Sequence, residues 1–175
     1  MNAYLDTTDS PAGPLTFAVD EHGALLWLTF HEGRYARTIE EELGREGRSV
    51  HQDRTRTALV RAQLEEYARG TRQVFDVPLA LVGTPWQQLV WRALIEIPFG
   101  ETRTYGQVAA LTGRPTAARA MGRANATNRI PLVIPCHRVI GADGSLTGYG
   151  GGLHIKTRLL AHEARHASPQ PLAAN

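Results

Sequence analysis

Residues 104–126 read TYGQVAALTGRPTAARAMGRANA, and this stretch decides how the second half of the chain folds. Residues 104–111 and 116–126 each predict a short helix. Between them lies TGRP, whose glycine and proline favour a turn. Two short helices joined by a glycine-containing turn predict a helix-turn-helix.

The second of these helices has an unusually smooth surface. Small residues leave one side nearly bare, and three arginines supply positive charge. The small residues are Ala117, Ala118, Ala120 and Gly122, and the arginines are Arg119, Arg123 and Arg129. A helix that reads bases in the major groove needs several Asn, Gln or Arg side chains, and this surface is too smooth for that. Its small residues instead favour close approach to the minor groove, in a binding mode that does not depend on the DNA sequence. The alternative is an alanine-rich helix packed inside the protein.

Downstream, residues 134–139 read IPCHRV and hold the only cysteine, Cys136. A thiol reacts as its anion, and the imidazole of His137 and the guanidinium of Arg138 follow it directly, where they could lower its pKa. Adjacent side chains of a strand point to opposite faces, so Cys136 and His137 meet only if the backbone turns or a water bridges them. Pro135 favours such a turn. The alternative is a buried, inert cysteine.

Composition limits the class of protein. A chain of 175 residues suffices for one ordinary domain or two small ones. A single cysteine allows no intramolecular disulfide and no cysteine cluster for zinc, so we expect no metal. The sequence has no segment that resembles a signal peptide or an apolar run of membrane-spanning length. These features predict a cytoplasmic protein.

Charge is distributed unevenly along the chain. Residues 1–99 carry 10 Arg against 14 Asp and Glu, a balance of −4, whereas residues 100–175 carry 9 Lys and Arg against 3 acids, a balance of +6. From Arg103 to Arg138 there are six arginines and no acid. The second half therefore favours a polyanionic partner, with a merely solvated basic face as the alternative.

The first half alternates between predicted strands and helices. Apolar patterning predicts strands at 3–8, 15–19 and 24–30, a loop with one short helix over 31–53, a helix over 54–69 and a strand over 74–82. With the helical second half, this predicts an α+β fold. We expect an N-terminal domain of residues 1–83, a C-terminal domain of residues 84–167 and a flexible tail of residues 168–175.

Two further segments flank the cysteine. A helix that opens at Thr84 and Pro85 is expected to bury Trp86, Leu89, Val90, Ala93, Leu94 and Ile97. Residues 141–152 are rich in glycine, which fits a loop that approaches a flat ligand, with Tyr149 as a wall. The last predicted helix covers residues 154–165.

Taken together, the ordered motifs resemble the methylated-DNA-protein-cysteine methyltransferases, also called O6-alkylguanine-DNA alkyltransferases. Six blocks carry the resemblance: TYGQVA at 104–109, ARAMG at 118–122, Asn128, IPCHRV at 134–139, GYGGG at 148–152 and LLAHE at 159–163. The resemblance implies a small ribonuclease-H-like α/β domain, followed by a mostly helical domain with the helix-turn-helix.

The resemblance also implies roles for individual residues in catalysis. Cys136 is expected to accept the alkyl group, and His137, held by Glu163, to remove the thiol proton through a water. Asn128 is expected to brace the link between the helix-turn-helix and the reactive loop. Tyr105 is expected to press on the phosphate of the target and to meet the flipped base.

Substrate-binding roles are implied in the same way. Arg119 is expected to fill the gap left in the DNA stack, on a DNA-binding surface made with Ala118, Ala120, Gly122 and Arg123. The alkylguanine is expected to lie against Tyr149 and Pro131, with main-chain groups of Val139 and Gly150 at its edge and Lys156 nearby.

These expectations predict a DNA repair enzyme without a cofactor. It would move the alkyl group of O6-alkylguanine, and of O4-alkylthymine, from duplex DNA to Cys136 in a single turnover, after flipping the nucleotide through the minor groove. We expect a monomer at the nucleoid, with cooperation on DNA left open. The alternatives are a DNA-binding protein that marks damage without repairing it, and a cysteine hydrolase that uses Cys136, His137 and Glu163.

Overall fold

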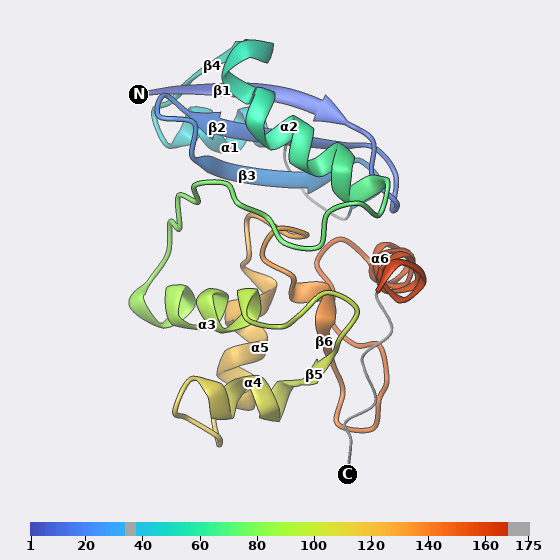
Figure 1. Ribbon diagram of the computed structural model, residues 1–175. Helices are drawn as coiled ribbons and strands as arrows, with labels where there is room; N and C mark the ends of the chain where they lie inside the picture. Colours follow the sequence, from blue (N-terminus) through green and yellow to red (C-terminus); the bar gives the residue numbers. More distant parts are fainter. Residues whose placement is uncertain (34–37, 168–175) are drawn as a thin grey trace.

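The computed structural model describes residues 1–33 and 38–167, so the predicted tail, residues 168–175, lies outside the described residues. Figure 1 shows a sheet with two helices stacked on a helical C-terminal part. The predicted α+β fold is confirmed. The expected domain boundary at residue 83 stays a prediction.

The N-terminal part is built on a four-stranded sheet with the order β3-β2-β1-β4. The strands are β1 (Asn2–Thr8), β2 (Leu15–Asp20), β3 (Leu25–Phe30) and β4 (Ser49–Gln52). The first three are antiparallel neighbours, whereas β4 pairs with β1 in parallel. A meander with a parallel strand added beside its first strand is the ribonuclease-H-like arrangement that the resemblance implied.

Two helices cover opposite faces of this sheet. Helix α1 (Ile39–Arg45) begins at a capping box on Thr38 and packs Leu43 against one face. Helix α2 (Arg54–Ala68) packs on the other face, which also meets the C-terminal part, and it buries Tyr67 there. The position of α2 therefore brings an N-terminal side chain to the junction of the two parts.

Two strand predictions in this half were wrong. Strand β4 lies within the predicted loop, and it is short and mostly exposed. Because it contains a single apolar residue, Val50, it lacks the alternation of apolar and polar residues that marks a strand. Conversely, residues 74–82 form no strand and make only one bridge, between Leu79 and Leu25. Their alternating apolar side chains pack onto the core, and Pro78 has no N–H to continue a ladder.

The C-terminal part, as far as residue 167, surrounds the cysteine with helices. Its elements are α3 (Pro85–Ile95), β5 (Arg103–Thr104), α4 (Tyr105–Leu111), α5 (Ala118–Ala126), the 3-10 turn η1 (Cys136–Arg138), β6 (Val139–Ile140) and α6 (Leu153–His166). Capping boxes on Thr84 and Thr104 begin α3 and α4. Helix α5 packs against both of these helices, and residues 112–117 connect it to α4. The use of this helix pair as a DNA-binding helix-turn-helix stays a prediction.

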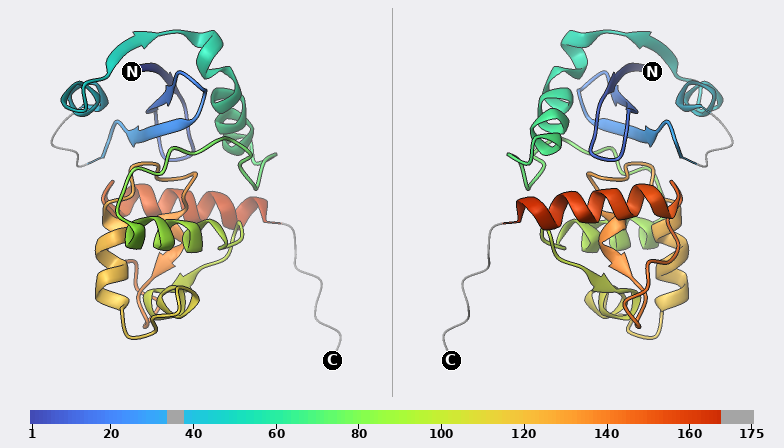
Figure 2. Two further views of the ribbon diagram at one scale, coloured as in Figure 1. Left: turned by 90° about the vertical axis from the view of Figure 1, so that its left-hand side faces the viewer. Right: turned by 90° about the vertical axis from the view of Figure 1, so that its right-hand side faces the viewer.

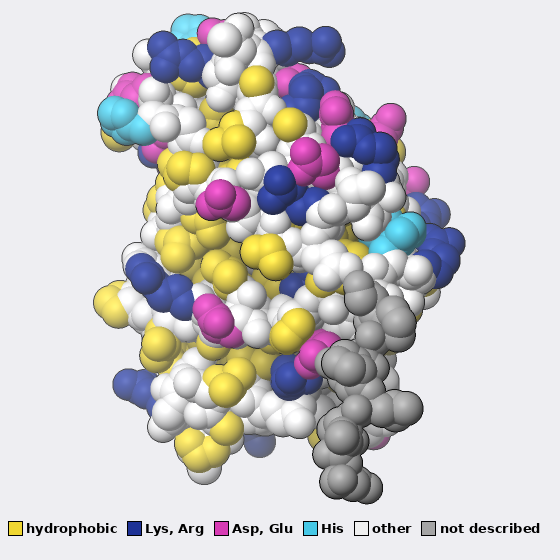
Figure 3. Space-filling model, viewed as in Figure 1, with side chains coloured by type: hydrophobic (Ala, Val, Ile, Leu, Met, Phe, Trp, Pro, Cys, Tyr) yellow, Lys and Arg dark blue, Asp and Glu magenta, His cyan; other side chains and the backbone are white. Residues whose placement is uncertain are grey.

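One expectation for α3 was wrong. Leu89 is 42% exposed, whereas Trp91 is buried and donates its indole N–H to the carbonyl of Ala124 at 3.0 Å. The buried side of α3 therefore includes Trp91 in place of Leu89 and faces α5. On the face drawn in Figure 3, apolar side chains gather over α3 and the segment before it, where the exposed large residues are Val74, Val82, Leu89 and Ile95.

The two parts share one apolar core. A single cluster of buried residues runs from Phe17 of the sheet through Tyr67 of α2 to Leu94 of α3 and Cys136. Helix α6 crosses the C-terminal part on its sheet side, as the two views of Figure 2 show. Cys136 thus lies on a framework to which both parts contribute.

Candidate active site

Cys136 begins the 3-10 turn η1, directly after Pro135. Its side chain is only 5% exposed, and its main-chain N–H donates to the carbonyl of Ile134. The backbone therefore turns at the cysteine, as Pro135 was expected to favour. Among the described residues, no hydrogen bond joins the Cys136 thiol to His137.

Asn128 braces the segment that leads to the cysteine. Its side-chain oxygen accepts from the N–H of Ile130 at 2.9 Å, and its amide nitrogen donates to the carbonyl of Ile134 at 2.9 Å. Between these two contacts lies Leu132, a buried residue with a φ of 81°, which a leucine adopts only at a cost. The two hydrogen bonds of Asn128 thus fix both ends of the strained segment 130–134.

Glu163 of α6 is the centre of a buried polar cluster. It is fully buried, as is His137, whose Nε2 lies 2.8 Å from Glu163 Oε1. Arg138 donates to both carboxylate oxygens, with Nη2 at 2.9 Å from Oε1 and Nε at 3.0 Å from Oε2. The hydroxyl of Tyr67 donates to Oε1 at 2.8 Å. The carboxylate therefore joins three side chains from α2 and η1.

Gly100 supplies another donor to this carboxylate, because its main-chain N–H lies 3.1 Å from Glu163 Oε2. Its φ is 77°, and a Cβ at this position would lie 2.6 Å from Cβ of Ala167. Only glycine suits both the conformation and the space. The turn before β5 is therefore shaped to bring a backbone donor to Glu163.

Charge in this cluster fixes the state of Glu163. Burial by itself raises the pKa of a carboxyl group, but the hydrogen bonds and charges of His137 and Arg138 outweigh it and hold the pKa of Glu163 well below its usual range. Glu163 is therefore an anion at neutral pH. An anionic carboxylate only accepts hydrogen bonds, so His137 Nε2 carries the proton between them.

The other imidazole nitrogen is consequently the basic one. Burial lowers the pKa of His137, and the hydrogen bond to Glu163 only partly opposes this, so the ring is neutral at rest. Its Nδ1 atom is buried and has no hydrogen-bond partner among the described residues. A neutral ring with Nε2–H bound to Glu163 presents a lone pair on Nδ1, which is the state of a general base.

The thiol itself is protonated at rest. Burial raises the pKa of Cys136 to about 11, against the opposing effects of hydrogen bonding to Asn128 and Tyr149 and of the positive charge of Lys156. The expectation that Arg138 lowers this pKa was wrong, because its guanidinium is turned to Glu163 and to the carbonyl of Ile97. Cys136 therefore depends on a base for activation.

Of the residues expected to form the base pocket, Lys156 and Tyr149 lie close enough to Cys136 to affect the pKa of its thiol. Lys156 is fully buried, and its ammonium donates to the carbonyls of Val139 and Thr147. Tyr105 donates from α4 to the carbonyl of Thr147 at 3.3 Å, so α4 and α6 both hold the glycine-rich loop. Tyr149 is half-buried against the core, Pro131 is buried, and Gly150 is exposed.

The residues expected to contact DNA lie on α5. Arg119, Ala120 and Arg123 are exposed, Ala118 and Gly122 are half-buried, and Met121, Ala124 and Asn125 form the buried side of the helix. Gly122 faces the ring of Tyr105, to which an added Cβ would make an ordinary contact at 3.6 Å. Because part of its smooth surface is exposed, α5 is not an alanine-rich helix enclosed by the protein.

Comparisons with known proteins identify the family of the chain. The family model described as "6-O-methylguanine DNA methyltransferase, DNA binding domain" matches residues 85–165. The chain is 45% identical, over 160 residues, to the methylated-DNA--protein-cysteine methyltransferase of Methanosarcina acetivorans, which covers 91% of this chain and 97% of that protein. The chain belongs to this family. The enzyme with the same name from Mycobacterium tuberculosis is 47% identical over 163 residues, with 92% of each chain covered.

The fold of the family is shared over nearly the whole chain. The crystal structure of Mycobacterium tuberculosis OGT in complex with DNA superposes with a TM-score of 0.80 and 42% identity, covering 94% of each chain. The crystal structure of Mycobacterium tuberculosis O6-methylguanine methyltransferase gives a TM-score of 0.80 and 43% identity, with 96% of each covered. This chain is thus a DNA repair methyltransferase with a DNA-binding domain.

Sequence reasoning missed two partners of Glu163 and misassigned a third. Tyr67 lay in a predicted helix but carried no sign that it reaches α6, and the N–H of Gly100 is a backbone group with no sequence signature. Arg138 stood in the quoted motif but was assigned to the thiol. In the part of the chain that the structure describes, no cluster of three metal-ligand side chains is close enough to hold an ion, and no helix is long and apolar enough to cross a membrane.

Proposed function

We propose that Cys136 accepts the alkyl group of O6-alkylguanine in duplex DNA and keeps it as a thioether. The observation that carries this proposal is the buried, neutral His137, whose proton position is fixed by Glu163, beside a buried thiol that requires a base. Cys136 is the only cysteine of a chain whose family transfers methyl groups from DNA to cysteine.

Activation begins with the thiol proton. A water between Cys136 and His137 Nδ1 passes the proton to the imidazole, and Glu163 stabilises the imidazolium that results. Glu163 cannot take the proton itself, because Arg138 and its other donors favour its charged form. Arg138 therefore acts on the cysteine indirectly, by keeping Glu163 an anion.

The thiolate then attacks the alkyl carbon. A bond forms between sulfur and carbon while the bond between carbon and guanine O6 breaks, and its electron pair goes to the base. The restored guanine takes up one proton, which balances the proton lost by the thiol. A thioether has no easy hydrolytic exit, so each molecule reacts once.

Access to the alkyl carbon requires that the nucleotide leave the stack, because the atom lies inside the duplex. The exposed side of α5 is smooth enough to enter the minor groove, and Arg119 on that side fills the gap in the stack. The extruded base enters between Tyr149 and Pro131, beside Tyr105 and Lys156. O4-alkylthymine presents a similar alkyl ether and is a second substrate.

The partner implied by this reaction is double-stranded DNA. We infer that the protein works on it as a monomer, at the nucleoid in the cytoplasm. The thiol, the base and the substrate account for the step described above, so the proposal includes no cofactor.

Intact mass before and after incubation with a duplex that contains O6-methylguanine tests the proposal. We expect a gain of one methylene mass that maps to the Cys136 peptide, is absent with unmethylated duplex, and disappears in Cys136→Ser. An unchanged mass for a protein that still binds the methylated duplex would instead indicate damage binding without repair. Repeated turnover on an ester or amide would indicate a hydrolase.

A further inference from the structure

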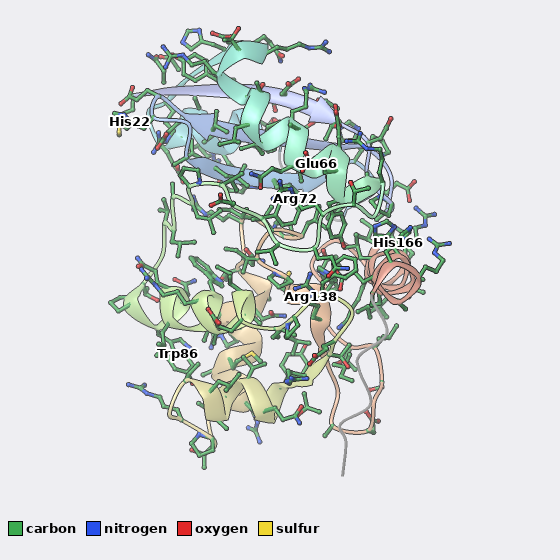
Figure 4. The ribbon with its side chains drawn as sticks, in the orientation of Figure 1. His22, Glu66, Arg72, Trp86, Arg138 and His166 are labelled. Atoms are coloured by element: carbon green, nitrogen blue, oxygen red, sulfur yellow. The ribbon has the colours of Figure 1, made fainter. Side chains whose placement is uncertain are left out.

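The N-terminal part contributes a side chain to the reactive centre. Tyr67 lies near the end of α2, is fully buried, and places its hydroxyl 2.8 Å from Glu163 Oε1 on α6. Figure 4 shows the labelled Arg138, which donates to the same carboxylate, at the junction of the two parts. The contact therefore spans the junction and ends on the residue that orients His137.

Tyr67 is held in place at both ends. Its ring stacks on Phe75 at 5.5 Å between centroids and meets the edge of Phe99 at 5.8 Å. Its main-chain carbonyl accepts from Nε2 of His162 at 2.8 Å, on the same helix as Glu163. With its ring fixed on two sides and its backbone bound to α6, Tyr67 has little freedom to turn its hydroxyl away.

The direction of the hydrogen bond is settled by charge. Burial, and then the charge of Glu163, raise the pKa of Tyr67 well above its usual value, so the phenol keeps its proton. An ionised carboxylate has no proton to donate. The Tyr67 hydroxyl is therefore a permanent donor to Oε1.

That oxygen is the one to which His137 is bound. Glu163 Oε1 receives His137 Nε2, the Tyr67 hydroxyl and Nη2 of Arg138 at 2.8, 2.8 and 2.9 Å. Donors that share one oxygen compete for its electron density, because each draws charge away from the others. The hydroxyl of Tyr67 therefore weakens the attraction of Oε1 for the proton on His137.

We propose that Tyr67 is a positioning residue of the reactive centre, through which the N-terminal part holds Glu163 and limits the basicity of His137. The proposal rests on the function proposed above, in which His137 receives the thiol proton. A base must be neutral before it can accept that proton, so an imidazole made too basic is already protonated at neutral pH. Tyr67 thus adds to the effect of burial, which by itself favours the neutral ring.

The other charged groups that affect His137 are accounted for. Arg138 and Lys156 both lower the pKa of His137 by their positive charge, and Glu163 raises it. His162 is beside Glu163 in sequence, but its Nε2 is bound to the Tyr67 carbonyl. A change at the Tyr67 hydroxyl leaves all of these groups in place.

The test is the pH dependence of methyl transfer, measured by quenched-flow with a methylated duplex. Tyr67→Phe keeps the ring and removes only the hydroxyl. We expect the acidic limb of the profile to move to higher pH by roughly half to one unit. A hydrogen bond to a charged group corresponds to roughly one to two units, and only part of that effect reaches His137 through Glu163. In a Glu163→Gln background, Tyr67→Phe should produce no further movement, because Tyr67 acts through Glu163.

A matched control removes a different contact across the junction. Arg158 of α6 binds Glu32 of the N-terminal part at 2.9 Å, and this ion pair does not involve Glu163. Arg158→Ala should leave the acidic limb in place. If it moves the limb as much as Tyr67→Phe does, loose docking of the parts is the cause, and the proposal is overturned.

A second variant changes the strength of the hydrogen bond without removing it, so a loss of protein stability does not explain its effect. Replacement of Tyr67 by a ring-fluorinated tyrosine keeps the hydrogen bond and makes the hydroxyl a stronger donor, so the limb should move to lower pH. An unmoved limb in both Tyr67 variants, with normal methyl transfer by the unaltered protein, overturns this proposal alone. Absence of methyl transfer by the unaltered protein would instead overturn the proposed function.

Discussion

Arg138 holds Glu163 with two nitrogens, Nη2 at 2.9 Å from one carboxylate oxygen and Nε at 3.0 Å from the other. Both side chains are buried, so neither charge is compensated by water. Such a pair contributes little net stability over an apolar pair, yet loss of one partner leaves a buried charge alone. The pair therefore has consequences for folding as well as for the reaction.

Arg138→Leu is expected to lower the free energy of unfolding by about 3–5 kcal/mol, because Glu163 then stays buried without its cation. Urea unfolding followed by circular dichroism measures this change. Arg103→Ala is the control, since it removes a partly exposed ion pair with Glu101 and should cost at most about 1 kcal/mol. Equal losses in the two variants would contradict a special role for the buried pair.

Stability should also decline in acid, in two stages. The pKa of His137 is lowered by burial, so the unfolded chain takes up this proton first, and stability begins to fall as pH drops below the ordinary value of 6.5. The pKa of Glu163 is depressed, so its contribution is present above its ordinary value of 4.5 and is lost as pH falls further. Urea midpoints measured from pH 8 downward should show both stages.

The share of the second stage that belongs to Glu163 can be removed by substitution. Glu163→Gln has no charge to lose, so its midpoint should be lower at neutral pH and change less below pH 4.5 than that of the unaltered protein. Parallel acid profiles for the two proteins would show that other carboxyl groups cause the decline.

Asn128→Ala is expected to release the strained segment before the cysteine. It removes both hydrogen bonds that enclose Leu132. The N–H of Ile130 is then buried without a partner, whereas the carbonyl of Ile134 keeps the main-chain N–H of Cys136. A buried group left unsatisfied costs about 1–3 kcal/mol, and the lost hydrogen bond to Ile134 adds about 1 kcal/mol, so we expect a loss of at least about 2 kcal/mol in urea unfolding.

Asn125 offers the matched control three residues earlier in the chain. It is buried like Asn128, but its side-chain oxygen has no hydrogen-bond partner among the described residues. Asn125→Ala removes an unsatisfied acceptor and should be close to neutral. A loss of stability as large as that of Asn128→Ala would show that both variants disturb the packing at the end of α5, and that the two hydrogen bonds of Asn128 are not the cause.

The sequence predicted those helices and turns that are determined by neighbouring residues in the chain. The helices that begin at Thr84 and Thr104 carry capping residues, and the glycine-containing turn separates α4 from α5. Strand β4 was missed because its pairing with β1, rather than its own composition, makes it a strand. The segment 74–82 was predicted wrongly for the converse reason, since its alternation serves packing on the core.

The candidate site likewise contains some residues that the sequence predicted and others that it did not. The motif around Cys136 led to the thiol, the imidazole and, through the family resemblance, Glu163. The direction of Arg138 and the arrival of Tyr67 depend on how the two parts pack, and contacts between residues as distant in sequence as Tyr67 and Glu163 leave no pattern in a single chain. Burial likewise reversed the expected pKa of Cys136, because burial is a property of the folded core.

Arg119→Ala is expected to separate nucleotide flipping from chemistry. Arg119 is exposed on α5, whereas Cys136 is buried in η1, so loss of the Arg119 side chain should leave the reaction with free O6-alkylguanine unchanged. Repair in duplex DNA should slow by roughly 10-fold to 100-fold, since unstacking a base costs a few kcal/mol and the inserted side chain offsets part of it. Single-turnover rates on both substrates measure this, with Arg45→Ala on the exposed side of α1 as the control for charge. Equal slowing on free base and duplex would show that Arg119 supports the fold of the site and does not fill the stack.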